Sequence, residues 1–183
     1  MLRFPVNDCN STHTLQGKDI KNHLSHKTKI ILLNSPSNPT GAVIDKKELE
    51  TIGILAVKKN LWIVSDEIYE KLIYDNQKHI SIASLGKDIK QQTITINGFS
   101  KSYAMTGWRI GYACGPKEII EAIVSLQSQT TSNTSSLAQM AALEALAGSQ
   151  KSIENMRKEF EIRRNIVFNL LSQVKEVSIV SPS

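Results

Sequence analysis

Lys101 and Arg109 stand eight residues apart and offer two complementary kinds of chemistry. A lysine amine can form a Schiff base with an aldehyde when its pKa is lowered enough to leave the neutral amine available. An arginine guanidinium is a planar fork of donors that suits a phosphate dianion. Lys101 also follows a strand-like run from Thr93 to Asn97, which would fix its position. The pair therefore predicts a site for a small molecule that carries both an aldehyde and a phosphate.

Pyridoxal 5′-phosphate is such a molecule, and three segments of the chain resemble motifs of the class I aminotransferases, which use it. The segment from Gly98 to Gly111, which contains the lysine and the arginine, resembles the family's lysine-attachment motif. Asn34-Ser-Pro-Ser-Asn-Pro-Thr-Gly41 resembles its Asn-Pro-x-Gly loop, and Val64-Ser-Asp-Glu-Ile-Tyr69 resembles its Asp-x-x-Tyr segment. All three occur in the family's order and with its approximate spacing. The run Met-Thr-Gly-Trp-Arg-Ile-Gly-Tyr-Ala-Cys-Gly-Pro is similar to the bacterial aspartate aminotransferase branch, and the resemblance extends from about Phe4 to the end of the chain.

The resemblance assigns the central chemistry to Lys101 and Asp66. Lys101 would hold the cofactor through a Schiff base, and its freed amine would later move a proton between the substrate α-carbon and the cofactor. Asp66 would pair with the pyridine nitrogen and keep it protonated, so that the ring acts as an electron sink. The plain alternatives are a solvated surface lysine and, because Ser65-Asp66-Glu67 resembles a helix start, an N-cap carboxylate. The adjacent Glu67 is the weaker candidate for the ring partner.

Four further residues are assigned to the cofactor's oxygen atoms by the same resemblance. Tyr69 and Asn38 would bond the ring oxygen, although asparagine before proline is also a common turn pair. Arg109 would bind the phosphate, and Ser100 would either donate its hydroxyl there or pack beside the lysine. The family commonly has another small hydroxyl residue three positions before the lysine. This chain has Gly98 there, so one phosphate contact would be absent or replaced.

Strand-like and helix-like segments alternate along the chain, as in an α/β protein. The run Ile30 to Leu33 is typical of a strand buried on both faces, and further strands are predicted over 61–65, 93–97 and 177–180. An apolar face predicts a helix over 46–59 and another over 153–171. Pro116 opens a predicted helix over 116–127, and an alanine-rich run predicts one over 135–147 with Gly148 as C-cap. Strand–helix–strand units imply a mostly parallel sheet with flanking helices. Ligands of such sheets bind beyond the carboxyl ends of the strands, which is where Asn38, Asp66 and Lys101 fall.

The composition limits the classes of protein to consider. The 183 residues are 40% hydrophobic and 21% charged, as in an ordinary globular protein with one substantial core. The net charge of +5 is not gathered in a block, so we expect no nucleic-acid partner, and His23 and His26 lack the further ligands of a metal site. No apolar run approaches the roughly 18 residues of a membrane span, and the N-terminus lacks the apolar core of a signal peptide. Cys9 and Cys114 form no CxxC pair, so free thiols in the cytoplasm are the expectation.

The resemblance covers only part of an aminotransferase. A complete family member has an N-terminal segment with a phosphate loop and an aromatic residue that stacks on the pyridine ring. It also has a C-terminal small domain with an arginine for the substrate carboxylate. Residues 1–183 therefore look like a partial cofactor-binding large domain, with about 150–183 leading toward the small domain. A split gene, a truncated gene and an excerpt of a longer protein would all give this pattern.

The resemblance implies transfer of an amino group between an amino acid, aspartate in the nearest branch, and a 2-oxo acid, in a homodimeric protein. Two alternatives stay open. The first is a pyridoxal-phosphate enzyme of another reaction type, such as a β-lyase. The second is a non-catalytic remnant that acts at most as the partner of a complementary chain.

Overall fold

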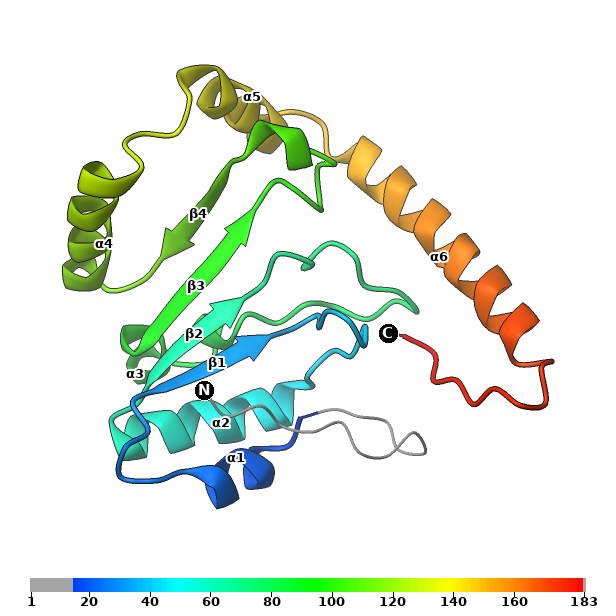
Figure 1. Ribbon diagram of the computed structural model, residues 1–183, viewed down its shortest axis with the longest axis horizontal. Helices are drawn as coiled ribbons and strands as arrows, with labels where there is room; N and C mark the ends of the chain where they lie inside the picture. The colour runs from blue at the N-terminus through cyan, green and yellow to red at the C-terminus, as the bar shows by residue number, and fades with distance from the viewer. Residues whose placement is uncertain (1–14, 183) are drawn as a thin grey trace.

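The centre of the computed structural model, which describes residues 15–182, is a four-stranded sheet in the order β1-β2-β3-β4 (Figure 1). β1 (Ile30–Asn34), β2 (Trp62–Asp66) and β3 (Thr93–Gly98) pair in parallel. β4 (Gly111–Cys114), which the sequence analysis did not predict, pairs antiparallel with β3. The α/β class and the mostly parallel sheet with flanking helices are confirmed. Cys114 is free and exposed, whereas Cys9 lies outside the described residues.

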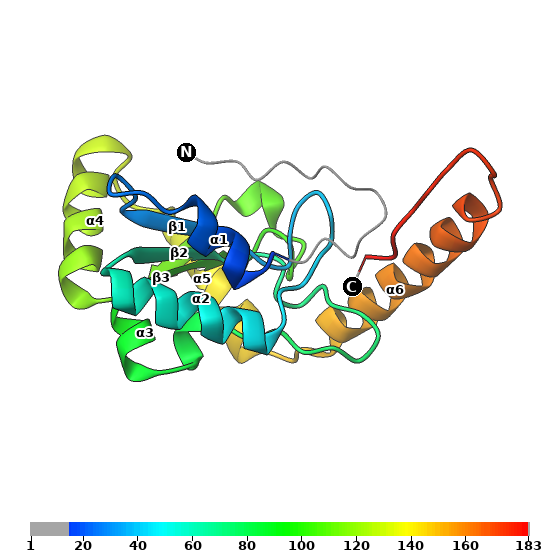
Figure 2. The same cartoon turned by 90° about the horizontal axis from the view of Figure 1, so that it is seen from below.

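One helix links the first two strands and forms most of the covering layer. α2 (Lys46–Lys59) begins at Asp45, whose carboxylate accepts a hydrogen bond from the Glu48 amide over 2.9 Å, and it ends at Asn60 in the left-handed region with φ 51°. Two short helices, α1 (Gly17–His23) and α3 (Lys87–Gln91), pack against α2 (Figure 2). Between these helices and the sheet lies the hydrophobic core, centred on Ile31, Leu33, Ile52, Ala56 and Ile63.

The opposite face of the sheet is bare, which corrects the expectation of strands buried on both faces. In β1, Ile31 and Leu33 are buried, but Ile30 and Leu32 are 56% and 55% exposed. β2 shows the same alternation in a milder form. A continuous apolar run indicates that both faces of a strand are meant to be covered. The described residues supply that cover on one face only.

Three longer helices follow the sheet. α4 (Lys117–Thr130) and α5 (Ser136–Ala147) lie on the β4 side, away from α1 and α2, and α6 (Lys151–Leu171) runs outside the carboxyl ends of the parallel strands (Figure 1). Residues 177–180, predicted as a strand, form none, because they pair with no other strand of the described sheet. None of the helices in residues 15–182 is both long and apolar enough to cross a bilayer.

Candidate active site

Three of the predicted site residues come together beyond the carboxyl ends of the parallel strands. Asn38 Nδ2 donates to Tyr69 Oη over 3.1 Å, and Lys101 Nζ lies 5.7 Å from the centre of the Tyr69 ring. The three side chains come from the loops after β1, β2 and β3 respectively. Asn38 and Lys101 are exposed, so a ligand can reach them. An amide, a phenol and an amine are thus gathered at the sheet edge where α/β proteins bind ligands.

Asp66 is the last residue of β2, and its carboxylate is partly used by the chain itself. Its Oδ1 accepts a hydrogen bond from the Ile68 amide over 3.2 Å. Residues 68–71 form a turn and not a helix, so the predicted helix start is wrong. The carboxylate therefore closes a turn that leads directly to Tyr69, which places the predicted ring partner and the predicted ring-oxygen donor on one short hydrogen-bonded segment.

Asn34, at the end of β1, is a positioning residue that the sequence analysis missed. Its Oδ1 accepts from the Asn38 amide over 2.8 Å, and its Nδ2 donates to the Asp66 carbonyl over 3.4 Å. The side chain therefore joins the loop after β1 to the end of β2. A polar last residue of an otherwise apolar strand was the available signal, but the sequence does not reveal what that side chain bonds.

Ser100 and Arg109 are tied together by the loop that carries Lys101. Thr106 Oγ1 donates to the Ser100 carbonyl over 2.9 Å, and Arg109 Nη1 donates to the Thr106 carbonyl over 3.1 Å. Ala104 and Arg109 hold positive φ values of 53° and 51°, which are uncommon for residues with a side chain and tend to occur at functional sites. These bonds link Arg109 to the backbone beside Lys101 rather than to the Asn38–Tyr69 pair.

Gly98 departs from the family pattern for a packing reason. A Cβ at this position would lie 3.0 Å from Gly111 Cα and 3.1 Å from the Ile110 carbonyl oxygen, both in the backbone of the neighbouring strand or its approach. Gly98 and Gly111 are also cross-strand partners. The close approach of β3 and β4 thus leaves little room for a side chain here, and a hydroxyl residue like the one that the family commonly has would require the neighbouring backbone to move by a few tenths of an ångström.

Glu67 is buried on the other side of the segment from Asp66. Its exposed fraction is 3%, and it accepts hydrogen bonds from Ser65, His79 and Ser81. Burial raises the pKa of this carboxyl, but the hydrogen bond and charge of His79, together with the two serine hydroxyls, outweigh burial and hold the pKa below its usual 4.5. The carboxylate is therefore fully engaged away from the ligand edge, which agrees with Glu67 being the weaker candidate for a ring partner.

A cavity of about 600 Å³ adjoins Tyr69, between the loop after β1 and α6. Its lining is mainly apolar and includes Leu72, Phe160 and Phe168. Two arginines also reach it, but each already has a carboxylate partner. Arg163 Nε donates to Glu159 over 2.9 Å, and Arg164 makes a forked pair with Asp75 at 2.6 Å. Within the described part of the chain, no group of His, Cys, Asp and Glu side chains is placed to hold a metal ion.

Comparison with known proteins decides the family. The model of the family "Aminotransferase class I and II" matches residues 1–183, the whole chain. The chain belongs to this family. It is 48% identical over 170 residues to an aspartate aminotransferase of Bacillus sp. (strain YM-2), and 52% identical over 158 residues to an asparagine–oxo-acid transaminase of Streptococcus mutans. The solved structure of the aspartate aminotransferase from Rhizobium meliloti superposes with a TM-score of 0.89 at 37% identity, covering 92% of this chain.

The aminotransferase match is nearly complete for this chain but not for its relatives. It covers 93% of the chain but only 43% of the Bacillus protein, and 86% but only 40% of the Streptococcus protein. For the Rhizobium structure the covered share is 42%. The chain therefore spans less than half the length of the relatives it matches, as the sequence analysis expected.

Proposed function

We propose that this chain carries the lysine-bearing core of a pyridoxal-phosphate-dependent aminotransferase, one that moves an amino group between aspartate, or a similar amino acid, and a 2-oxo acid. The observation that carries the proposal is the meeting of Asn38, Tyr69 and Lys101 at the carboxyl ends of three strands. The names of the relatives, aspartate aminotransferase and asparagine–oxo-acid transaminase, support the substrate class. The homodimeric assembly expected from the family belongs to the same proposal.

The side chains present fit the cofactor. Pyridoxal phosphate has an aldehyde, a ring oxygen, a ring nitrogen and a phosphate, and the site offers a matching group for each. These are the Lys101 amine, the Asn38 amide with the Tyr69 hydroxyl, the Asp66 carboxylate, and the Arg109 guanidinium with the Ser100 hydroxyl. Exposure of the lysine and the asparagine leaves the edge open to a ligand. The Arg109 guanidinium suits the anionic phosphate, and the Asp66 carboxylate suits a protonated ring nitrogen.

The chemistry of the residues follows from their types. When bound, pyridoxal phosphate supplies an electron sink for the electrons released at the substrate α-carbon. Lys101 would hold the aldehyde and, once its amine is free, would take the proton from the substrate α-carbon and pass it to the carbon of the cofactor that had carried the aldehyde. Asp66 would pair with the pyridine nitrogen, and its negative charge would favour the protonated form of that nitrogen. Tyr69 and Asn38 would orient the ring through its oxygen, and Arg109 would bind the phosphate.

The test is covalent trapping of the cofactor on Lys101. The chain is mixed with pyridoxal phosphate, reduced with borohydride, digested and examined by mass spectrometry. We expect the added mass on the peptide that contains Lys101, and its loss in Lys101→Ala. Lys117→Ala is the matched control, because Lys117 is an exposed lysine in a surface pair with Glu121. Label spread evenly over surface lysines and unchanged in Lys101→Ala would refute the assignment.

A further inference from the structure

Glu67 is a buried carboxylate with a complete set of partners, and the proposed chemistry gives it no role. Ser65 Oγ and Ser81 Oγ each donate to Glu67 Oε1 over 2.9 Å, and His79 Nε2 stands 2.8 Å from Oε2. Because the lowered pKa keeps Glu67 ionised, the carboxylate can only accept, so His79 must carry a proton on Nε2. Burying a charge is costly unless it is paired and hydrogen-bonded in this way. A carboxylate kept in such a place calls for an explanation beyond general stability.

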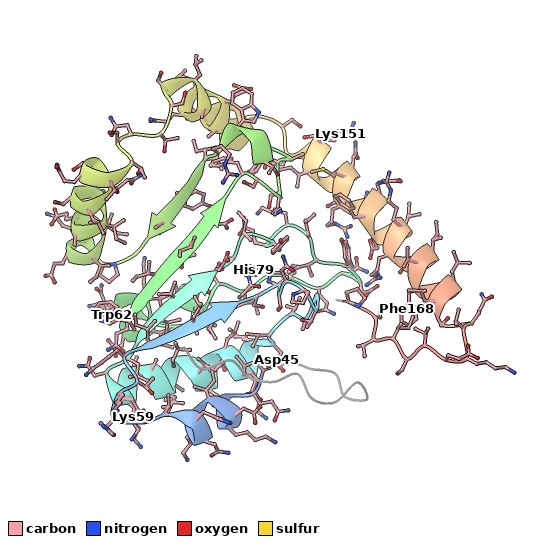
Figure 3. The ribbon with its side chains drawn as sticks, viewed as in Figure 1. Asp45, Lys59, Trp62, His79, Lys151 and Phe168 are labelled. Carbon is pink, nitrogen blue, oxygen red and sulfur yellow. The ribbon has the colours of Figure 1, made fainter. Side chains whose placement is uncertain are left out.

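The cluster closes the base of the loop that carries Tyr69. Ser65 lies in β2, His79 lies in the returning arm of the loop, and Ser81 immediately precedes a short 3-10 turn, η1 (Ile82–Ser84). Figure 3 shows His79 close to the carboxyl end of β2. The side chain of Glu67 thus joins the outgoing and returning arms of residues 67–81. Tyr69 lies two residues beyond this junction and projects to the ligand edge.

The main chain around Glu67 is held as firmly as the side chain. Its amide donates to the Ile96 carbonyl over 2.9 Å, and its carbonyl accepts from the Glu70 amide over 2.9 Å. Successive side chains along a strand point to opposite faces, so Ser65 and Glu67 share the covered face while Asp66 faces the other way. Anchoring Glu67 on the covered face therefore fixes the direction of Asp66 on the ligand side and the path of the turn to Tyr69.

We propose that Glu67 and His79 form a positioning pair that fixes Asp66 and Tyr69 in their ligand-facing geometry before a ligand binds. Neither residue contacts the ligand edge in this account; both act through the turn between Asp66 and Tyr69. The inference rests on the proposed function in one respect only, namely that Asp66 and Tyr69 bind the cofactor ring. Holding such groups within a fraction of an ångström is what makes a site effective.

The decisive measurement uses the 183-residue chain without any cofactor. Its four tyrosines are replaced with 3-fluorotyrosine, and the resonance of Tyr69 is assigned with Tyr69→Phe. In Glu67→Ala we expect the fluorine resonance of Tyr69 to shift and broaden and the amide exchange of Ile68 to accelerate. The resonance of Tyr103, whose hydroxyl donates to Gln150 away from the cluster, should stay in place. Glu70→Ala is the matched control, because Glu70 pairs with the exposed Lys71 at 3.4 Å. It should leave the line width of Tyr69 and the exchange of Ile68 unchanged.

A conservative variant separates positioning from general stability. In Glu67→Gln the amide oxygen still accepts from both serines and the amide nitrogen can donate to a neutral imidazole, so the native resonance of Tyr69 should largely return. If Glu67→Ala lowers the unfolding midpoint but leaves Tyr69 and Ile68 as in the native chain, the inference is wrong. If that variant does not fold, Ser81→Ala removes a single donor and is judged by the same two signals.

A second measurement distinguishes this inference from the proposed function. Supporting residues around metal ligands typically contribute about ten- to a hundredfold in affinity, and we expect Glu67→Ala to weaken pyridoxal phosphate binding by about tenfold. Failure of the native chain to bind pyridoxal phosphate would count against the proposed function, while the fluorine signals would still decide the positioning role. Native affinity in a Glu67→Ala chain whose Tyr69 has moved would show that the pair does not serve this ligand.

Discussion

Residues 15–98 and residues 111–182 contain similar amounts of apolar side chain but bury them very differently. The hydrophobic core is built from residues between Ile20 and Ile89. In the later part, α4 has no buried residue, α5 buries Ala138 and Ala142, and α6 buries Ile153. The earlier part contains both layers that enclose its core, namely the sheet and α2. The helices of the later part have apolar side chains that the other described residues leave largely uncovered.

α5 makes the difference plain. Its residues are apolar on every side, a pattern typical of a helix that is surrounded by protein. Yet Leu137 is 76% exposed and Met140 is 65% exposed. Asn38, Asp66 and Tyr69 lie on loops and strand ends of residues 15–98. Lys101 lies on the loop between β3 and β4, where Tyr103 Oη donates to Gln150, just before α6, over 3.2 Å. The earlier part thus encloses its own core and carries three of the site residues, whereas many apolar side chains of α4 to α6 stay exposed within residues 15–182.

The largest expected effect tests the burial contrast directly. Ile63 of β2 is fully buried in the core beneath α2, so Ile63→Ala should lower the free energy of unfolding by about 2–5 kcal/mol. Ile166 on α6 is 53% exposed, and Ile166→Ala should change the free energy by less than about 0.5 kcal/mol. Urea unfolding followed by circular dichroism measures both. Similar losses for the two variants would mean that α6 is packed in solution and that the contrast is wrong.

The sequence predicted the compact part better than the later part, for physical reasons. The bounds of α2 were predicted as observed, because its apolar residues recur on one helical face, and in the structure Asp45 and Asn60 cap its two ends. β4 was missed because four residues with two small side chains among them carry little periodicity. Residues 177–180 have a strand-like pattern, but a strand also needs a partner edge, which a local pattern cannot reveal.

The candidate site shows the same division between local and through-space information. Strand ends and family motifs were enough to predict that Asn38, Asp66 and Lys101 lie at one edge of the sheet. The roles of Asn34 and His79 could not be predicted, because they depend on contacts with Asp66 and Glu67 across the fold. The strand over 30–33 was predicted to be buried on both faces, but Ile30 and Leu32 are exposed. An apolar run indicates that a strand can be covered on both faces, but it does not show whether the described residues supply that cover.

The next prediction compares how the buried carboxylate of Glu67 and the exposed carboxylate of Glu154 affect stability at low pH. The folded-state pKa of Glu67 lies below its usual 4.5, so its contribution to stability is present above that value and is lost as the pH falls through the lowered pKa. Below about pH 4.5, the free energy of unfolding should therefore fall less steeply with decreasing pH in Glu67→Gln than in the native chain. Urea unfolding at a series of pH values measures this slope.

The exposed carboxylate of Glu154 is the control for the acid series. The hydrogen bond with Arg157 lowers its pKa as well, but the side chain lies in solvent, where ion pairs contribute little. Glu154→Gln should leave the pH dependence close to that of the native chain. If both variants reduced the pH dependence of the unfolding free energy equally, the burial of Glu67 would add nothing to its contribution to stability.

The smallest expected effect concerns the two helix starts. Asp45 caps α2 with a real side-chain bond to the Glu48 amide, so Asp45→Ala should cost about 1 kcal/mol of unfolding free energy. Ser135 occupies the same position before α5 but makes no capping bond with its side chain. Ser135→Ala should therefore leave the free energy of unfolding nearly unchanged, because no backbone amide in the first turn of α5 loses a hydrogen-bond partner. Paired urea curves measured under one buffer resolve a difference of this size. A cost for Ser135→Ala equal to that for Asp45→Ala would show that the start of α5 is ordered in solution by its own cap, and that the later part of the chain is more self-sufficient than its exposed faces indicate.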